Sequence, residues 1–232
     1  MLVKGLGIIT PFRKGIVERG ITTMSFQEQN SIINGFKQKF VCESVPHIPV
    51  ETFCSLFNRK FERLSGEQVD LNPGLDIYTI RHNLVKFGDL SLDLRSMIPN
   101  GMLVPEDDVS VIYKCIINPA GTVLNPAENK KFSLPFHRDP VYLRFLCRRT
   151  FKYAGETQGI DLKRSSFEQV DSASVFSLRC PKNEVKNFNF SEGAIVFNPT
   201  YLHAVNCEMP AGSVALSVSV SLLGVPRRLL NR

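Results

Sequence analysis

The chain has 232 residues, 43% of them hydrophobic, and a formal net charge of +6 at pH 7. A chain of this length can bury a sizeable core, and no Pro/Gly/Ser-rich linker divides it, so we expect one large domain. Its 28 Lys and Arg residues are spread along the sequence without a long uninterrupted run. That distribution is typical of a solvated surface and disfavours a nucleic-acid groove as the reason for the charge.

The cysteines and the N-terminus indicate the cellular compartment of the protein. Six cysteines lie far apart with no Cys-x-x-Cys pair, which disfavours a zinc site or a redox couple. Several fall inside apolar runs, where a free Cys packs as a small hydrophobic residue. The apolar stretch at residues 1–9 is too short for a signal peptide, and Arg13 and Lys14 follow soon after it. No window reaches the length of a membrane span, so we expect a soluble cytoplasmic protein with no membrane partner.

Two amphipathic helices are predicted near the N-terminus, after a Gly-punctuated segment over 1–24 that is typical of an edge strand or an arm. The first helix covers about 26–40 and begins with a capping box at Ser25–Glu28. The second covers about 50–65. Apolar residues repeat at helical spacing along both of them: Ile32, Ile33, Phe36, Phe40, Phe53, Leu56, Phe57, Phe61 and Leu64. Each helix needs an apolar partner, which implies a sheet for the helices to cover.

From Asp76 onward the pattern changes to that of strands. Short runs that alternate in polarity are separated by turn residues, and they cover 77–85, 110–117, 141–153, 174–178, 193–197 and 213–222. So many short strands after two helices predict a mainly β protein with flanking helices, folded as an antiparallel sandwich or barrel. We expect a single domain over 1–232, in which an N-terminal helical region at about 1–75 packs on a β core at about 76–225.

One cation interrupts an apolar strand face. The run over 141–153 has a face of apolar residues that Arg149 breaks. Such a cation needs a partner, because an unpaired buried charge is costly. The partner would be a carboxylate of the protein or an anionic ligand.

A candidate metal site lies in the run Leu134–Asp139, taken together with His203. His137 and Asp139 alternate on one side of an extended segment, so both side chains can face the same point. His203 follows an apolar strand and an Asn-Pro turn, which would deliver its side chain to a rim. Two His and one carboxylate leave open positions on a metal, as suits non-haem Fe(II) and oxygen chemistry. The alternative is a local hydrogen bond between His137 and Asp139, with His203 as a rim histidine that binds no metal.

The order of these features resembles the 2-oxoglutarate- and Fe(II)-dependent dioxygenases over about 110–222. The resemblance implies a double-stranded β-helix, a jelly-roll or cupin-like core, with His137, Asp139 and His203 as the iron ligands at its open end. It also implies Fe(II) as the cofactor, 2-oxoglutarate and O₂ as cosubstrates, and succinate as a product. The activity that it implies is hydroxylation of a small molecule or of a residue on a macromolecule.

The chain departs from the family pattern at the cosubstrate anchor. Many members carry an Arg on the closing strand that pairs with the far carboxylate of 2-oxoglutarate, whereas the matching stretch here, Gly212–Ser217, has no cation. Some branches, the JmjC-like hydroxylases among them, instead use a Lys on a strand shortly after the His-x-Asp pair. Lys152 matches that arrangement, and Arg149 is its rival by strand alternation. Arg144 and Arg148 are the next residues to test.

Two other functions are compatible with the sequence. One is a jelly-roll binding or structural protein in which the His-x-Asp…His group is incidental and the missing Arg marks lost catalysis. The other is a cupin-like metalloenzyme that uses the same ligands without 2-oxoglutarate. Metal content after anaerobic Fe(II) loading, followed by succinate release with 2-oxoglutarate, distinguishes the three. The sequence does not reveal the substrate, because specificity in such folds depends on the loops and the N-terminal region.

Overall fold

Antiparallel β-strands make up more than half of the residues that the computed structural model describes, which are residues 41–61, 67–68, 74–91, 94–95, 108–124, 126, 128–155 and 161–223. The larger sheet contains β1 (Cys42–Val45), β2 (Glu67–Gln68), β3 (Asp76–Lys86), β4 (Asp108–Asn118), β6 (Leu143–Tyr153), β7 (Ser165–Gln169), β10 (Ala194–Phe197) and β12 (Ser213–Leu222). The smaller sheet contains β5 (Lys130–His137), β8 (Ser174–Arg179), β9 (Val185–Asn189) and β11 (His203–Met209). The described helices are α2 (Val50–Phe61) and the short 3-10 helices η2 (Phe87–Asp89), η3 (Leu162–Arg164) and η4 (Pro181–Asn183).

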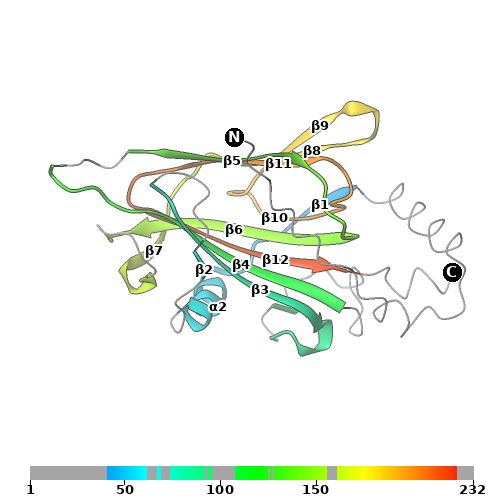
Figure 1. Cartoon of the computed structure of the whole chain (residues 1–232), viewed down its shortest axis with the longest axis horizontal. Coiled ribbons are helices and arrows are strands. Elements are labelled where there is room, and N and C mark those ends of the chain that lie inside the picture. Colours follow the sequence, from blue (N-terminus) through cyan, green and yellow to red (C-terminus); the bar gives the residue numbers. More distant parts are fainter. Residues whose placement is uncertain are drawn as a thin grey trace, which may run out of the picture.

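The two sheets form a jelly-roll sandwich (Figure 1). The strand order is β1-β10-β6-β12-β4-β3-β2 in the larger sheet, with β7 beside β6, and β5-β11-β8-β9 in the smaller one. The expected mainly β fold with a double-stranded β-helix core is therefore confirmed. Each of the six predicted strands is present, with ends that differ from the prediction by no more than two residues. The arm over 1–24 and the helix over 26–40 lie outside the described residues, and the division into an N-terminal region and a β core stays a prediction.

Strand β12 gives the larger sheet two unlike faces. It pairs along its whole length with β4 on one side and with β6 on the other. Its Val and Leu residues belong to the main apolar core, together with β4 and β6 residues of the same face. Its serines point the other way, toward the smaller sheet, because successive side chains on a strand alternate between the two faces.

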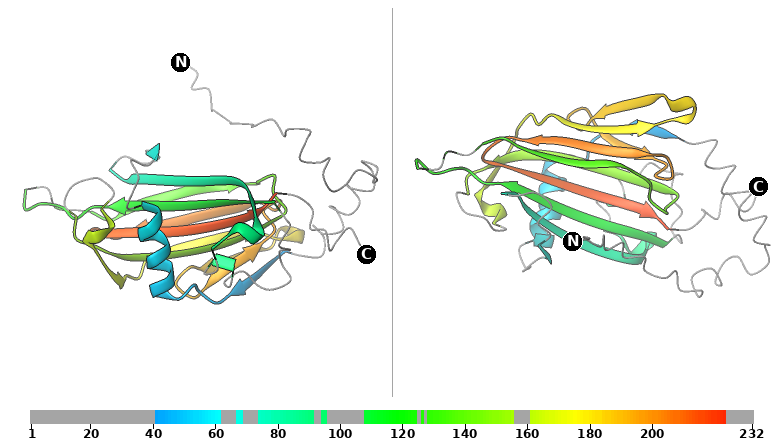
Figure 2. Two further views of the ribbon diagram at one scale, coloured as in Figure 1. Left: turned by 90° about the horizontal axis from the view of Figure 1, so that it is seen from below. Right: turned by 45° about the horizontal axis from the view of Figure 1, so that its top comes forward.

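Helix α2 covers the apolar face of the larger sheet (Figure 2, left). Phe53, Phe57 and Phe61 lie on one side of it, with ring centroids 4.9 and 5.7 Å apart along the helix. Phe57 also meets the ring of Tyr113 on β4 edge-on, at 5.9 Å. The helix predicted over 50–65 is thus confirmed over 50–61, and its predicted end lies outside the described residues.

All six cysteines are free thiols. Five of them are buried, and Cys42 on β1 is half-buried. Among the described residues, we find no helix with both the length and the apolar character that a membrane crossing requires.

We expect Phe57→Ala to destabilise the fold by about 3–5 kcal/mol, because it removes a fully buried ring from the contact between α2 and the sheet. Urea denaturation measures the change. Ser55→Ala is the control, since Ser55 is exposed on the same helix and its loss should change stability by no more than about 0.5 kcal/mol. Equal effects of the two substitutions would contradict the packing described here.

Candidate metal centre

His137 and His203 are brought together by strand pairing. His137 is the last residue of β5 and His203 is the first residue of β11, and the two lie opposite each other in the antiparallel register. A β-bulge follows His203, where the register shifts before Val205. The ring centroids of the two histidines are 4.2 Å apart.

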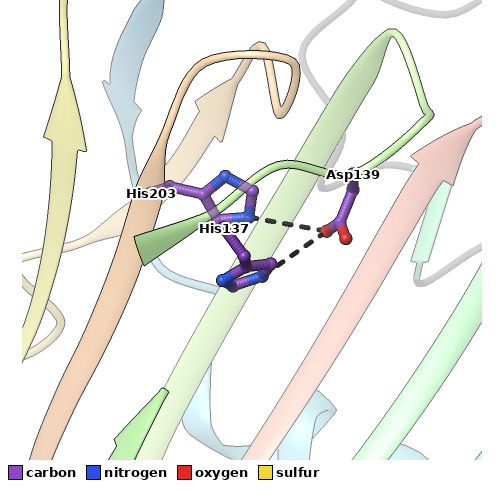
Figure 3. A group of neighbouring side chains, drawn as sticks. All are labelled: His137, Asp139 and His203. Atoms are coloured by element: carbon purple, nitrogen blue, oxygen red, sulfur yellow. Dashed lines mark ion pairs between the residues drawn. The ribbon is translucent and has the colours of Figure 1, made fainter. Parts of the chain in front are cut away.

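Asp139 completes the group from the turn after β5 (Figure 3). Its backbone N–H donates to the carbonyl oxygen of Pro199 at 2.9 Å, which ties this turn to the one before β11. Its Oδ2 lies 3.4 Å from Nε2 of His203 and 3.9 Å from Nε2 of His137. One potential ligand atom from each residue lies within 4.8 Å of the others. The structure therefore brings together the three residues that the sequence singled out, although β5 ends before Asp139.

The backbone fixes how the two histidines present their nitrogens. Nδ1 of His137 lies 2.8 Å from the carbonyl oxygen of Pro135, and Nδ1 of His203 lies 2.9 Å from that of Tyr201. A carbonyl only accepts, so each Nδ1 carries a proton, and in the neutral form of each ring the lone pair is then on Nε2, the atom that faces Asp139. Nε2 of His203 is buried and has no hydrogen-bond partner. This pattern fits a metal site, because a ligating His donates its other N–H to a neighbouring acceptor.

Asp139 is held in its ionised form. Burial raises the pKa of its carboxyl, but the nearby His203 ring and the charge and hydrogen bond of Arg144 outweigh that effect, so the pKa lies well below its usual range. Arg144 on β6 donates a short hydrogen bond to Oδ2 of Asp139 and another, at 2.8 Å, to Ser221 on β12. The carboxylate is thus available to a cation at neutral pH and is fixed in place by the larger sheet.

His203 forms the closed side of the group. Only 2% of its surface is exposed, and its ring packs against Phe176 and Phe197 with centroids at 5.9 and 5.1 Å. His137 and Asp139 are partly exposed. A ligand would therefore approach from the side of His137 and Asp139, while the aromatic rings keep water from His203.

A cavity of about 150 Å³ extends from the two histidines into the space between the sheets. Three cations line it: Lys114, Arg144 and Arg148. No acidic side chain is among the described residues that line the cavity. The rest of the lining is largely aromatic and aliphatic, with two serines of β12: Ile112, Ile116, Phe132, Leu134, Leu146, Phe176, Phe190, Phe197, Val205, Ser217 and Ser219. A small apolar pocket with a few convergent polar groups is a typical ligand site.

The structure places the expected anchors, Lys152 and Arg149, away from this cavity. Lys152 is exposed near the far end of β6 and pairs with Glu168 on β7. Arg149 lies on the opposite face of β6 from the cavity, where it donates to the carbonyl oxygen of Ile48 and to Gln169. The partner that Arg149 needs is thus supplied by the protein itself, and alternation along β6 turns Arg144 and Arg148 toward the cavity instead.

Arg148 is the most deeply buried of the cavity cations. It is 5% exposed, and the acceptors found for its guanidinium are two sulfur atoms, Sγ of Cys207 at 2.8 Å and Sδ of Met209 at 3.6 Å. Its Nε is buried without a hydrogen-bond partner. The sequence offered Arg148 only as a later choice and missed Lys114, because the direction of the β4 side chains depends on pairing with β12, which the sequence does not show.

No known family model matches the sequence, and no curated protein matches it. Solved structures that resemble the fold include a prolyl-4-hydroxylase from Pseudomonas putida, at 11% identity and TM-score 0.42 over 84% of this chain and 97% of that one. A 2OG-Fe(II) oxygenase family member from Burkholderia pseudomallei is 12% identical with a TM-score of 0.43, over 86% of this chain and 94% of that one. HygX from Streptomyces hygroscopicus, solved with nickel and 2-oxoglutarate bound, is 10% identical with a TM-score of 0.41, over 86% of this chain and 87% of that one. The resemblance expected from the sequence is thus also found in the structure. At these identities and TM-scores the structural resemblance does not support an activity. Any proposal of an activity rests on the residues of this chain.

We expect both His137 and His203 to be Nδ1–H tautomers in the metal-free protein at about pH 8, because each Nδ1 faces a carbonyl oxygen. Long-range proton–nitrogen correlation spectra of histidine-labelled protein distinguish the two tautomers. Asp139→Ala serves as the control for peak assignment, since it removes the carboxylate without touching either carbonyl. Protons on Nε2 of both rings would contradict the geometry described above.

Proposed function

We propose that this protein is an Fe(II)- and 2-oxoglutarate-dependent oxygenase that hydroxylates a small molecule or a residue on a macromolecule. One observation carries the proposal. Three buried polar atoms without a hydrogen-bond partner face the same cavity: Nε2 of His203, Nε of Arg148 and Oγ of Ser219. Unsatisfied buried groups are costly and call for an explanation. A metal that accepts the first lone pair, and a carboxylate that accepts from the other two groups, would satisfy all three.

The metal ligands in this proposal are His137, Asp139 and His203. Two imidazole nitrogens and one carboxylate oxygen form a set that suits Fe(II) and leaves other positions on the ion open. When bound, the iron would supply the O₂ chemistry by which one oxygen atom enters a substrate C–H bond. The other oxygen atom enters 2-oxoglutarate, which leaves as succinate and CO₂. Arg144 has a positioning role, since it holds the Asp139 carboxylate in place.

The far carboxylate of 2-oxoglutarate would bind at Arg148, assisted by Ser219. Ser217 of β12 lies in the stretch where the family's Arg was expected, and it pairs with Arg148 of β6 on one side and with Lys114 of β4 on the other. Residues directly opposite each other in antiparallel strands share a face, about 5 Å apart. Arg148 on the neighbouring strand β6 can therefore reach the space that an Arg at Ser217 would fill.

The aromatic wall would exclude water from the reacting atoms. Phe176 and Phe197 pack on His203, and Phe190 lines the cavity beside them. In a water-poor site the ion pair between the cosubstrate carboxylate and Arg148 is stronger than it would be in solvent. The cytoplasmic location predicted from the sequence stays a prediction.

We expect Asp139→Ala to weaken Fe(II) binding at least about 100-fold while the fold stays intact, because the variant loses one of three ligands. Anaerobic titration measures the affinity, and circular dichroism measures the fold. Glu208→Ala is a matched control, since Glu208 lies on β11 and pairs with Asn129 away from the two histidines. Equal iron affinity in Asp139→Ala and the wild-type protein would rule out this ligand set.

We expect Arg148→Gln to raise the dissociation constant of 2-oxoglutarate about 10- to 100-fold with little change in metal affinity, because a charge-assisted contact is lost. Calorimetry on protein loaded with Mn(II) under argon gives both constants. Lys152→Gln is the matched control, with the same loss of charge on the same strand but outside the cavity.

Other outcomes would redirect the assignment. A large effect of Lys152→Gln with none of Arg148→Gln would return the anchor to the residue that the sequence favoured. Wild-type protein that binds the metal but not 2-oxoglutarate would be a cupin-like metalloenzyme. Protein that binds neither would be a jelly-roll binding or structural protein.

A further inference from the structure

The charge of the cavity exceeds what the proposed cofactor and cosubstrate would neutralise. Lys114, Arg144 and Arg148 line it, and the acidic group beside them is Asp139. A divalent metal and a doubly charged 2-oxoglutarate cancel each other, so the surplus of positive charge remains after both have bound. A surplus of charge in a partly desolvated space is costly and attracts a further anion.

A fourth cation lies on the same face of the larger sheet. Arg81 on β3 pairs directly with Ile112 on β4, which lines the cavity, so the two side chains point to the same side. Lys114 lies two residues further along β4, opposite Thr79. Arg81 and Lys114 are therefore diagonal neighbours, a spacing of about 7–8 Å that long side chains can bridge.

The surroundings of Arg81 and Lys114 leave both cations available to bind an anion. Arg81 is exposed, and among the described residues it makes no hydrogen bond or ion pair. Lys114 is half-buried, and its contact in the described part of the chain is with the face of the Phe132 ring, 6.0 Å from the centroid. Burial lowers the pKa of Lys114, and Arg148, Arg81 and Arg144 lower it further, so the four cations act on one another.

The two cations lie on the open side of the sandwich. At the closed end, Phe132 of β5 packs with Ile77 of β3 and Ile116 of β4. Arg81 lies further along β3, toward the end of the sandwich where His137 and His203 lie, and there it is exposed. In the right-hand view of Figure 2, β3 and β4 extend beyond the smaller sheet. A molecule that binds Arg81 can thus reach the cavity from outside.

We propose that Arg81 and Lys114 bind an oxyanion group, a carboxylate or a phosphate, on the substrate of this enzyme. This inference rests on the proposed function, since it assigns the substrate class for the same site. A cavity of about 150 Å³ is smaller than the roughly 300 Å³ at which pockets for drug-sized ligands begin. A cavity of this size leaves little room for a whole substrate beside the cosubstrate, so the charged group of the substrate would lie at its edge, at Arg81 and Lys114.

Paramagnetic broadening tests the inference without knowledge of the substrate. Mn(II) is loaded in place of Fe(II), 2-oxoglutarate is added to saturation under argon, and inorganic phosphate or acetate is then titrated in. We expect the phosphorus signal of phosphate, the methyl signal of acetate, or both to broaden as the anion binds near the metal. The anion that binds more tightly indicates whether the substrate carries a phosphate or a carboxylate.

Matched variants locate the binding site. Arg81→Gln should weaken the binding of the anion about five- to tenfold, because one charged donor is lost, and should leave the dissociation constants of Mn(II) and 2-oxoglutarate unchanged. Lys152→Gln, which also removes one charge from an exposed position of the larger sheet, should have no effect. Because Arg81 is exposed, its replacement does not disturb a packed core.

The failure of this inference differs from the failure of the proposed function. If Mn(II) or 2-oxoglutarate does not bind the wild-type protein, the proposed function fails. If both bind but neither anion broadens, or if saturating 2-oxoglutarate abolishes the broadening, the oxyanion site is refuted and the proposed function is untouched. Equal broadening in Arg81→Gln and the wild-type protein also refutes it.

Discussion

The pairing of β12 with β4 and β6 is the constraint on which both the core and the candidate site depend. Each residue from Ser213 to Leu222 has a partner on both neighbouring strands. A slip of one residue would turn the Val and Leu side chains into the cavity and the serines into the apolar core. The register that buries the apolar residues against α2 is therefore the same register that presents Ser217 between Arg148 and Lys114.

The candidate metal centre depends on a second, more local constraint. In both histidines the Nδ1 atom faces the carbonyl oxygen two residues earlier in the chain, that of Pro135 for His137 and that of Tyr201 for His203. The backbone at each strand end thus fixes the tautomer and the direction of Nε2 without help from a distant side chain. Arg144 does the same for Asp139 from the larger sheet. Each of the three side chains is thus held by a hydrogen bond within the protein, as is typical of preorganised metal sites.

The sequence could predict what depends on local pattern. Alternation from Ser213 to Leu222 and the helical spacing of Phe53, Phe57 and Phe61 give the elements and their apolar faces. The spacing of His137 and Asp139, with His203 after an Asn-Pro turn, gave the candidate metal group, and its role as a set of ligands stays a prediction.

The position of the cations depends on which strands become neighbours, and local pattern does not reveal that. From the sequence, family spacing favoured Lys152 and alternation along β6 favoured Arg149, whereas the register with β12 places Arg144 and Arg148 on the cavity side of β6. Lys114 showed no signal at all, because its strand precedes the His-x-Asp pair and enters the cavity only through β12.

The polar face of the larger sheet lowers the stability of the fold when no ligand is bound. Arg148 is buried with sulfur atoms as acceptors, and the hydroxyl oxygen of Ser219 is buried with no hydrogen-bond partner. Burying these groups costs free energy that the apolar face of the same strands must offset. Apolar residues at these positions would remove the cost and would also remove the donors that an anion needs. Stability and binding therefore favour different residues on this face, as is typical of functional sites, and the apolar packing under α2 offsets the cost of burying the cavity cations.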